Sequence, residues 1–342
     1  MIEYKAGKRN IRYRVDVYRG AAKKGELMVS DAKISMSSSS EIKVSASFTV
    51  ASNKDIDWYK DRLRPVLVDG GKETPLGIFV PGSVSKESGL LQVDAYDLGI
   101  LLQEDKIDSR IILKAGSNYI EEIEKILISA GITKIIAEPS EATLLTDRAD
   151  WDIGTEKLKI VNQLLEEISY NDVSFDQAGS CLLRAHTYPS AATIKHIYKS
   201  GEASIISSEI SVVSNAHEIP NVFIAVVSNP DNDEPLISKY TNDNPVSKTS
   251  TVYTGRRKVS VLKPNNVATQ ADLDNYVRKA AFEAMQEEET VKFVTAINPE
   301  HGIGDTVALD LPKYSGILEE TDWEIDLSSL EMTHTGKKVI YL

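Results

Sequence analysis

Alternating apolar and polar residues run through the first quarter of the chain. Apolar side chains occupy every second position over 11–17 and again over 42–50. A period of two residues is the signature of a half-buried β-strand. Gly20, Gly25 and the run Ser37–Ser40 between these segments suit turns. The pattern predicts a mostly β region up to about residue 93.

The period changes after Asp94, where leucines at helical spacing predict a helix following Tyr96. A clearer helix is predicted over Ser117–Gly131, with Ser117 as its N-cap and Gly131 closing its C-terminus. The same apolar spacing starting at Thr155 predicts another helix. We expect these amphipathic helices to pack on a sheet or on each other.

Beyond Asn171 the pattern returns to β. Strands are predicted within 181–185, 208–213, 222–227, 307–311 and 323–327. The segment 229–250 holds Pro230, Pro235 and Pro245, which predicts a long loop or an edge excursion. One helix is inserted in this half, over 268–288, with Thr269 as its cap. Its acidic end, Glu287–Glu289, is predicted to be frayed and solvated.

The composition is that of a globular protein with two or three domains: 342 residues, 42% hydrophobic and 26% charged. No apolar run approaches the roughly 18 residues of a membrane-spanning helix. The first residues lack the pattern of a secretion signal, so we expect synthesis in a reducing cytoplasm. A single cysteine, Cys181, excludes an internal disulfide and a multi-thiolate zinc site.

The charge is uneven along the chain. A net charge of -12 argues against wrapping of nucleic acid, which needs lysine and arginine to neutralise phosphates. Residues 1–30 nevertheless carry eight basic side chains against three acidic ones. This basic segment is either a solvated strand face or a contact for an acidic neighbour.

Four motifs are candidates for catalytic or ligand-binding chemistry. Cys181 lies five residues before His186, an offset that points the two side chains to opposite faces of a strand, so a buried thiol is favoured over a nucleophile. His217-Glu218 resembles the start of a zinc-protease helix, but Pro220 and the missing second histidine exclude that site.

The other two motifs are favoured as turns. Asp231-Asn232-Asp233-Glu234 offers oxygens to calcium but lacks the glycine and distant glutamate of an EF-hand. Gly302-Ile303-Gly304-Asp305 lacks the third glycine of a nucleotide-binding fingerprint and precedes a strand. We therefore single out no catalytic, cofactor-binding or metal-ligating residue, and we expect no cofactor and no enzymatic activity.

Several segments together resemble the phage tail baseplate hub family of late-control D-like proteins, which also form the hub half of type VI secretion spikes. The segments that carry this resemblance, in order, are Val93–Asp97, Ala115–Ser117, Ile120–Ile132, Trp151, Leu158–Ile168, Gly302–Val307, Trp323–Ile325 and Met332–His334. Their order along the chain also fits the family.

The resemblance implies an α+β fold with two tail-tube-like antiparallel β-barrel or sandwich domains joined by an α/β middle region. The domains predicted on this basis are 1–93, 94–200 and 201–342, the last with the inserted helix 268–288. Three copies would form a ring that adapts a six-fold tail tube to a three-fold tip and lines its channel. The implied partners are a homotrimer of this chain, a tube or distal tail protein above, a spike below, and possibly a tape-measure protein.

DNA or other cargo would pass through such a ring without specific binding, and the assembled protein would belong to a virion tail or tail-like particle. Since the chain stops at Leu342, any wall-degrading activity is expected on a separate protein. Two alternatives stay open: a β-rich carbohydrate-binding or other assembly module, and a cell-wall hydrolase. Against the first, aromatic residues are only 7% and Trp58, Trp151 and Trp323 are scattered; against the second, no convergent acid, base and nucleophile is found.

Overall fold

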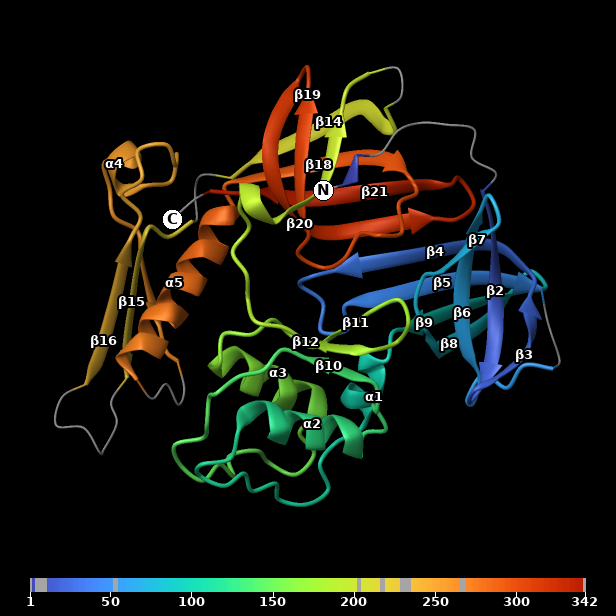
Figure 1. Ribbon diagram of the computed structural model, residues 1–342, viewed down its shortest axis with the longest axis horizontal. Coiled ribbons are helices and arrows are strands. Elements are labelled where there is room, and N and C mark those ends of the chain that lie inside the picture. The colour runs from blue at the N-terminus through green and yellow to red at the C-terminus, as the bar shows by residue number, and fades with distance from the viewer. Residues whose placement is uncertain are drawn as a thin grey trace.

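The structure is a computed structural model that describes residues 2–3, 11–51, 55–201, 204–215, 219–227, 235–264 and 269–340. Figure 1 shows β-rich parts above and to the right of a small helical part. Most strand pairs are antiparallel, and the helices are few and short. The expected α+β class is confirmed at this level, and among the described strands no sheet closes into a barrel.

The N-terminal part is a sandwich of two sheets. One sheet has the strand order β3 (Ala22–Leu27), β2 (Ile11–Arg19), β6 (Arg62–Asp69) and β7 (Lys72–Pro75). The other contains β4 (Val29–Ser37), β5 (Val44–Ala51), β9 (Leu90–Tyr96) and β8 (Val80–Glu87). Their inward-facing side chains, among them Val15, Ile34, Phe48 and Leu63, form one core cluster. The alternation seen in the sequence is therefore the burial pattern of this sandwich.

The middle part packs helices over a small sheet. The helices are α1 (Gly99–Glu104), α2 (Tyr119–Ser129) and α3 (Lys157–Glu167). The sheet contains β10 (Ile135–Ala137), β12 (Cys181–Leu183) and β11 (Ser174–Phe175). The apolar stripes of α2 and α3 meet in one core, in which Ile123, Leu127 and Leu164 are fully buried.

The predicted cap of α2 is corrected by one residue. Asn118, not Ser117, is the N-cap: its side-chain oxygen accepts from the backbone N–H of Ile120 at 2.9 Å and of Glu121 at 3.3 Å. Both residue types are good caps, so the sequence alone did not decide between neighbours. Gly131 lies just beyond the helix with φ of 85°, which confirms its predicted place.

The C-terminal part of the chain is built on another group of hydrogen-bonded strands, which we call the C-terminal sheet. Its strands are β1 (Ile2–Glu3), β13 (Ile194–Lys199), β19 (Thr306–Leu311), β20 (Tyr314–Asp326), β21 (Glu331–Lys338), β18 (Glu289–Ala296) and β14 (Ile206–Ser214), and the short 3-10 helix η1 (Ala191–Thr193) leads into β13. A separate apolar cluster, including Tyr198, Phe293 and Leu309, forms the core of this part.

Strand β20 joins the two β-rich parts into one eleven-stranded sheet. Over 314–319 it pairs with β19, and after an irregularity between Glu320 and Asp322 the same strand pairs with β4 of the sandwich. Trp323 and Met36 are partners in this second register. The predicted domain boundaries, 1–93, 94–200 and 201–342, stay a prediction. Strand β13, at the end of the predicted 94–200 region, lies in the C-terminal sheet.

The insertion in the C-terminal half is larger than the single predicted helix. Strands β14 and β18 form an antiparallel hairpin that ends at the pair Ser214 and Glu289. The segment between these two residues is inserted at the end of that hairpin. That segment holds a sheet of β16 (Leu236–Thr241), β15 (Val222–Val227) and β17 (Val259–Leu262), with α4 (Thr251–Thr254) and α5 (Gln270–Gln286). Helix α5 covers one face of this sheet and forms a separate core with it.

The two ends of α5 differ in how well the sequence predicts them. Thr269 is the cap of α5, since its hydroxyl accepts from the backbone N–H of Asp272 at 3.1 Å, as predicted. The acidic run after α5 is not a frayed, solvated end. Glu288 is buried and accepts from the hydroxyls of Ser247 and Thr249, and Glu289 opens β18. Buried hydroxyl donors thus stabilise a carboxylate that the sequence placed in solvent.

Candidate functional site

Cys181 is a buried thiol, as the sequence favours. Cys181 is buried in β12, and burial followed by the charge of Asp97 raises the pKa of its thiol to about 12. The Nδ1 atom of His186 lies 2.9 Å from the side-chain oxygen of Asn171, rather than beside Cys181. A thiol that stays protonated is a poor nucleophile. The favoured interpretation, a buried thiol, therefore holds.

Two other sequence motifs, His217-Glu218 and Asp231–Glu234, lie outside the described residues. The third, Gly302–Asp305, is a turn entering β19, and Gly304 has φ of 70°, as a tight-turn glycine requires. The Asp305 carboxylate of this turn also accepts hydrogen bonds. Asp305 accepts from the backbone N–H of Gly302 at 2.9 Å and from Lys195 at 2.7 Å.

The basic N-terminal segment is partly described. Lys5, Lys8 and Arg9 lie outside the described residues. Within β2, Arg14 pairs with Glu73 at 2.7 Å and with Asp16 at 2.9 Å. Side chains bound in this way to acids of the same sheet fit the solvated-face interpretation of the segment.

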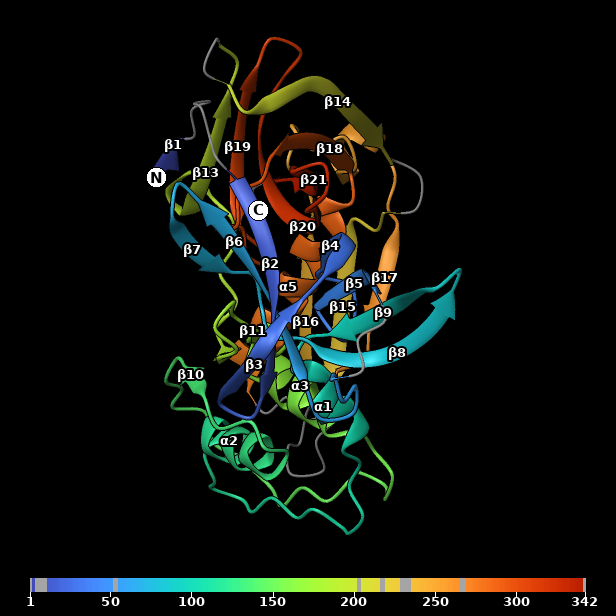
Figure 2. The same ribbon diagram turned by 90° about the vertical axis from the view of Figure 1, so that its right-hand side faces the viewer.

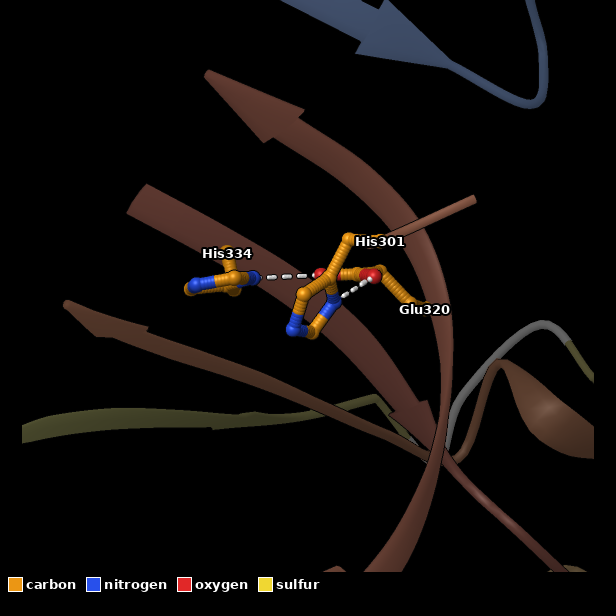
Figure 3. A group of neighbouring side chains, drawn as sticks. All are labelled: His301, Glu320 and His334. Carbon is orange, nitrogen blue, oxygen red and sulfur yellow. Dashed lines mark hydrogen bonds and ion pairs between the residues drawn. The ribbon is translucent and has the colours of Figure 1, made fainter. Parts of the chain in front are cut away.

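The most unusual group of polar side chains is buried in the C-terminal sheet. Figure 3 shows the Glu320 carboxylate lying between two imidazoles, those of His301 and His334. The Nδ1 atom of His301 lies 2.5 Å from one carboxylate oxygen, and Nδ1 of His334 lies 2.5 Å from the other. The side chains of all three residues are at most 1% exposed. We call these three residues the histidine–glutamate cluster.

The outer nitrogens of the cluster also have partners. The Nε2 atom of His301 lies 2.7 Å from the Tyr198 hydroxyl, and Nε2 of His334 lies 2.8 Å from the Thr295 hydroxyl. His196 stacks on His301, with ring centroids 3.7 Å apart, and binds Asp305 through Nε2 at 3.0 Å. The cluster thereby connects β13, β18, β20, β21 and the 297–305 loop.

The electrostatics favour ionised carboxylates in this network. Burial raises the pKa of Glu320, but the charges and hydrogen bonds of His301 and His334 outweigh burial and hold that pKa below its usual value. Asp305 behaves alike: burial opposes its ionisation, and hydrogen bonds from His196 and Lys195 lower its pKa. The site is a set of buried charges satisfied by partners, as such charges must be.

Two imidazoles and a carboxylate are also a donor set for zinc. The three ligand atoms lie within 4.8 Å of one another. Ligands on a tetrahedral zinc, at roughly 2.0–2.2 Å from the metal, stand about 3.3 Å apart. The 2.5 Å distances from each imidazole Nδ1 to the Glu320 carboxylate are shorter than this separation between zinc ligands. The Nε2 atom of each histidine is hydrogen-bonded to a hydroxyl. This geometry fits a hydrogen-bonded network better than a metal centre.

A cleft of about 1300 Å³ lies beside the cluster, where the sandwich, the middle part, α5 and the 298–305 loop meet. His301 and Glu320 form part of its wall, and so does Glu319, whose pKa burial raises to about 7. A carboxyl group that titrates near neutrality is a candidate general acid. Both nitrogens of the nearby His301 are occupied, so His301 offers no free base to Glu319.

No protein-family model matches the chain. No curated protein matches its sequence. Solved structures do match. A tail protein from Neisseria meningitidis MC58 has a TM-score of 0.70 at 12% identity, covering 95% of this chain and 96% of that chain. The 43 kDa tail protein of prophage MuSo2 from Shewanella oneidensis has a TM-score of 0.66 at 9% identity, covering 96% and 98%.

A third match is a chain in the Francisella PdpA-VgrG complex, with a TM-score of 0.60 at 10% identity, covering 98% of this chain and 54% of that one. This chain has the fold of phage tail proteins. The resemblance predicted from the sequence is thereby confirmed for the fold. At these identities no residue of the histidine–glutamate cluster is assigned a role from the tail proteins, and its role follows from geometry alone.

The cluster lies where β20 passes from the C-terminal sheet to the sandwich. Glu320 immediately precedes the irregularity at which β20 changes its partner from β19 to β4. Sequence reasoning missed it because the three residues are far apart along the chain. One signal was available in the sequence. Strand alternation puts Glu320 on the same face as the apolar Leu318, which is an inward position for a carboxylate. Among the described residues, no helix is long and apolar enough to cross a bilayer.

Proposed function

We propose that this protein is a structural hub at the tip of a phage tail or a related injection machine. The observation that carries the proposal is the likeness to a tail protein over 95% of this chain and 96% of that chain, with a TM-score of 0.70. Similarity over the whole length argues for a shared architecture rather than one shared module. We assign the protein no catalytic role, because the buried polar groups of the cluster are occupied by one another.

In this proposal three copies form a ring in which two tube-like β-domains of each copy, residues 1–93 and 201–342, alternate around a channel. The 94–200 region joins these two domains in each copy. Six similar domains would meet a six-fold tube above, and three chains would meet a three-fold spike below. A tape-measure protein is a further partner in the channel, and the acid excess of the chain suits passage of DNA without binding.

Edge strands supply the contact surface for such a ring. Among the described strands, β8 and β14 each pair with a single neighbour, so each leaves a row of backbone donors and acceptors unpaired within the sheet. Figure 2 shows the hairpin of β8 and β9 projecting from the body of the molecule. Val84 and Leu90 are exposed on this hairpin, and Val212 and Val213 on β14. Addition of β8 of one copy to β14 of the next would make a continuous sheet.

The test is the mass and shape of the protein in solution. Light scattering across a concentration series should give three times the 37.7 kDa chain mass, and negative-stain images should show a three-fold ring with a central hole. Val84→Glu with Val213→Glu should reduce the trimer, because both add charge to apolar edge positions. Lys72→Glu with Lys313→Glu, on exposed positions of other strands and turns, is the control. A compact monomer that persists when tube and spike proteins are co-expressed would refute the hub.

A further inference from the structure

The inserted sheet has one covered face and one bare face. Side chains of β15 and β16 that point to α5, such as Phe223, Ala225 and Leu236, belong to its core. The alternate positions point the other way. On β15 and β17 these are aliphatic, whereas on β16 they are Ile237, Lys239 and Thr241. The four most exposed aliphatic side chains are Val226, Ile237, Val259 and Val261, between 47% and 63% exposed. We call this the bare face.

The bare face points away from the molecule. In Figure 1, α5 lies between the inserted sheet and the rest of the chain, with β15 and β16 on the outer side. Mixed sheets with aliphatic residues on both sides are normally covered on both sides. An outer sheet face with several exposed aliphatic side chains is a candidate contact surface.

The described segment that holds β16 and β17 is basic. Residues 235–264 carry six basic side chains and a single acidic one, in a chain whose net charge is -12. Lys239 lies on the bare face itself, opposite Ile224 in the register, and Lys263 follows β17. A partner for this surface must therefore be both apolar and acidic, since charge complementarity sets specificity.

The middle part of the same chain offers that chemistry. Residues 105–156 carry eleven acidic and six basic side chains. On α2, Glu121, Glu124 and Ile128 follow one another at helical spacing along one stripe, and Ile128 is 56% exposed. Ile112, Leu145 and Ile153 are exposed in the neighbouring loops. We call the stripe of Glu121, Glu124 and Ile128 on α2 the acidic face.

The two faces cannot meet within one copy. Figure 1 places α2 at the bottom of the molecule and the bare face of the inserted sheet at its outer left. A contact between two different faces of identical chains is heterologous, and it closes into a ring when the rotation between copies permits.

We propose that the bare face of the inserted sheet docks on the acidic face of a second copy of this chain. The proposal rests on the proposed ring and names a second, outer contact between its neighbours. Three strands spaced 4.8 Å apart give a patch of only about 200 Å², far below the roughly 800 Å² per partner of a stable interface. The contact therefore strengthens a ring held by edge strands rather than forming one alone.

Charge reversal tests this pairing in the full-length protein. Lys239→Glu with Lys263→Glu should weaken association about tenfold or more in sedimentation velocity, and so should Glu121→Lys with Glu124→Lys. All four substitutions in one chain restore opposite charges and should recover most of the lost association. Lys72→Glu with Lys313→Glu is again the matched control, and circular dichroism checks that each variant is folded.

Zero-length carbodiimide cross-linking of mixed ¹⁵N- and ¹⁴N-labelled copies gives a second readout. Mixed-isotope peptides joining 235–264 to 105–156 are expected. Unchanged association in both reversals, failure of the fourfold variant to recover, or a wild-type monomer would each overturn the inference. A ring that survives all reversals refutes only this outer contact, whereas a missing ring in the presence of tube and spike proteins refutes the hub itself.

Discussion

Glu320 lies beside the point where β20 passes from one β-rich part to the other. Its carboxylate is nearly inaccessible to solvent, and each oxygen has a histidine partner. A buried charge with all its partners is close to neutral for stability, but removing one partner leaves the other uncompensated. The energetic weight of the cluster therefore appears only when it is broken.

Glu320→Gln should lower the free energy of unfolding by about 3 kcal/mol, because it removes the charge that both imidazoles face. Urea denaturation at pH 7 measures the change. Glu331→Gln is the control, since Glu331 is exposed at the start of the neighbouring strand β21, and its loss should stay within about 0.5 kcal/mol. Equal effects of the two substitutions would contradict the role of the cluster.

The lowered pKa of Glu320 also predicts how the stability difference between wild type and Glu320→Gln changes with pH. Because the folded-state pKa of Glu320 lies below its ordinary value, its contribution is present above about pH 4.5 and is lost as the pH falls below that. The stability difference between wild type and Glu320→Gln should therefore narrow from pH 6 to pH 3.5. Asp97, whose pKa burial raises to about 6, acts in the opposite direction, and it cancels because both proteins contain it. A constant difference over this range would contradict the prediction.

At this scale the sequence identified residue types better than roles. It placed Gly131 and Thr269 correctly, because helix ends depend on local chemistry. It did not find the cluster, because His301, Glu320 and His334 come from a loop and two strands that only the tertiary fold brings together. Glu288 was misplaced for the same reason, since its donors lie some forty residues earlier.

Among the elements, α2 offers a direct comparison of two candidate caps. Asn118→Ala should cost about 1 kcal/mol or more, because its oxygen accepts from two N–H groups and its amide also donates to Ser140 at 2.6 Å. Ser117→Ala should cost only a few tenths. Thermal or urea unfolding of both variants decides between them. A larger loss at Ser117 would restore the cap that the sequence alone predicted.

Elements with long, regular patterns were predictable, and short ones were not. The sandwich strands and α2, α3 and α5 show sustained apolar periodicity. Strand β16 lies inside the proline-rich 229–250 segment, and β17 has only four residues. Such strands form because α5 covers them, so their signal is in the tertiary contact rather than in the local sequence.

For the whole molecule, the insertion behaves as an attachment to a hairpin. The backbone N–H of Asn215 donates to the carbonyl of Glu288 at 3.0 Å, so the two ends of the insertion already lie together. Replacing 216–287 by Asn-Gly should therefore leave a folded protein with a two-residue turn. Circular dichroism and a single cooperative unfolding transition would show it. A lower melting temperature is expected, because contacts such as Lys279 to the Tyr170 carbonyl are lost. An unfolded product would contradict this view of the insertion.

The sharing of β20 between two sheets also orders events during synthesis. Ser37 of β4 pairs with Asp322 of β20, so one edge of the N-terminal sandwich lacks its partner until nearly the whole chain has been translated. At roughly 5–20 residues per second, that edge waits about 15 to 60 s on the ribosome. A nascent chain with an open strand edge is a template for pairing with another chain. Several ribosomes on one message would bring such edges close together, and a chaperone that holds β4 until β20 emerges would be needed most in that interval.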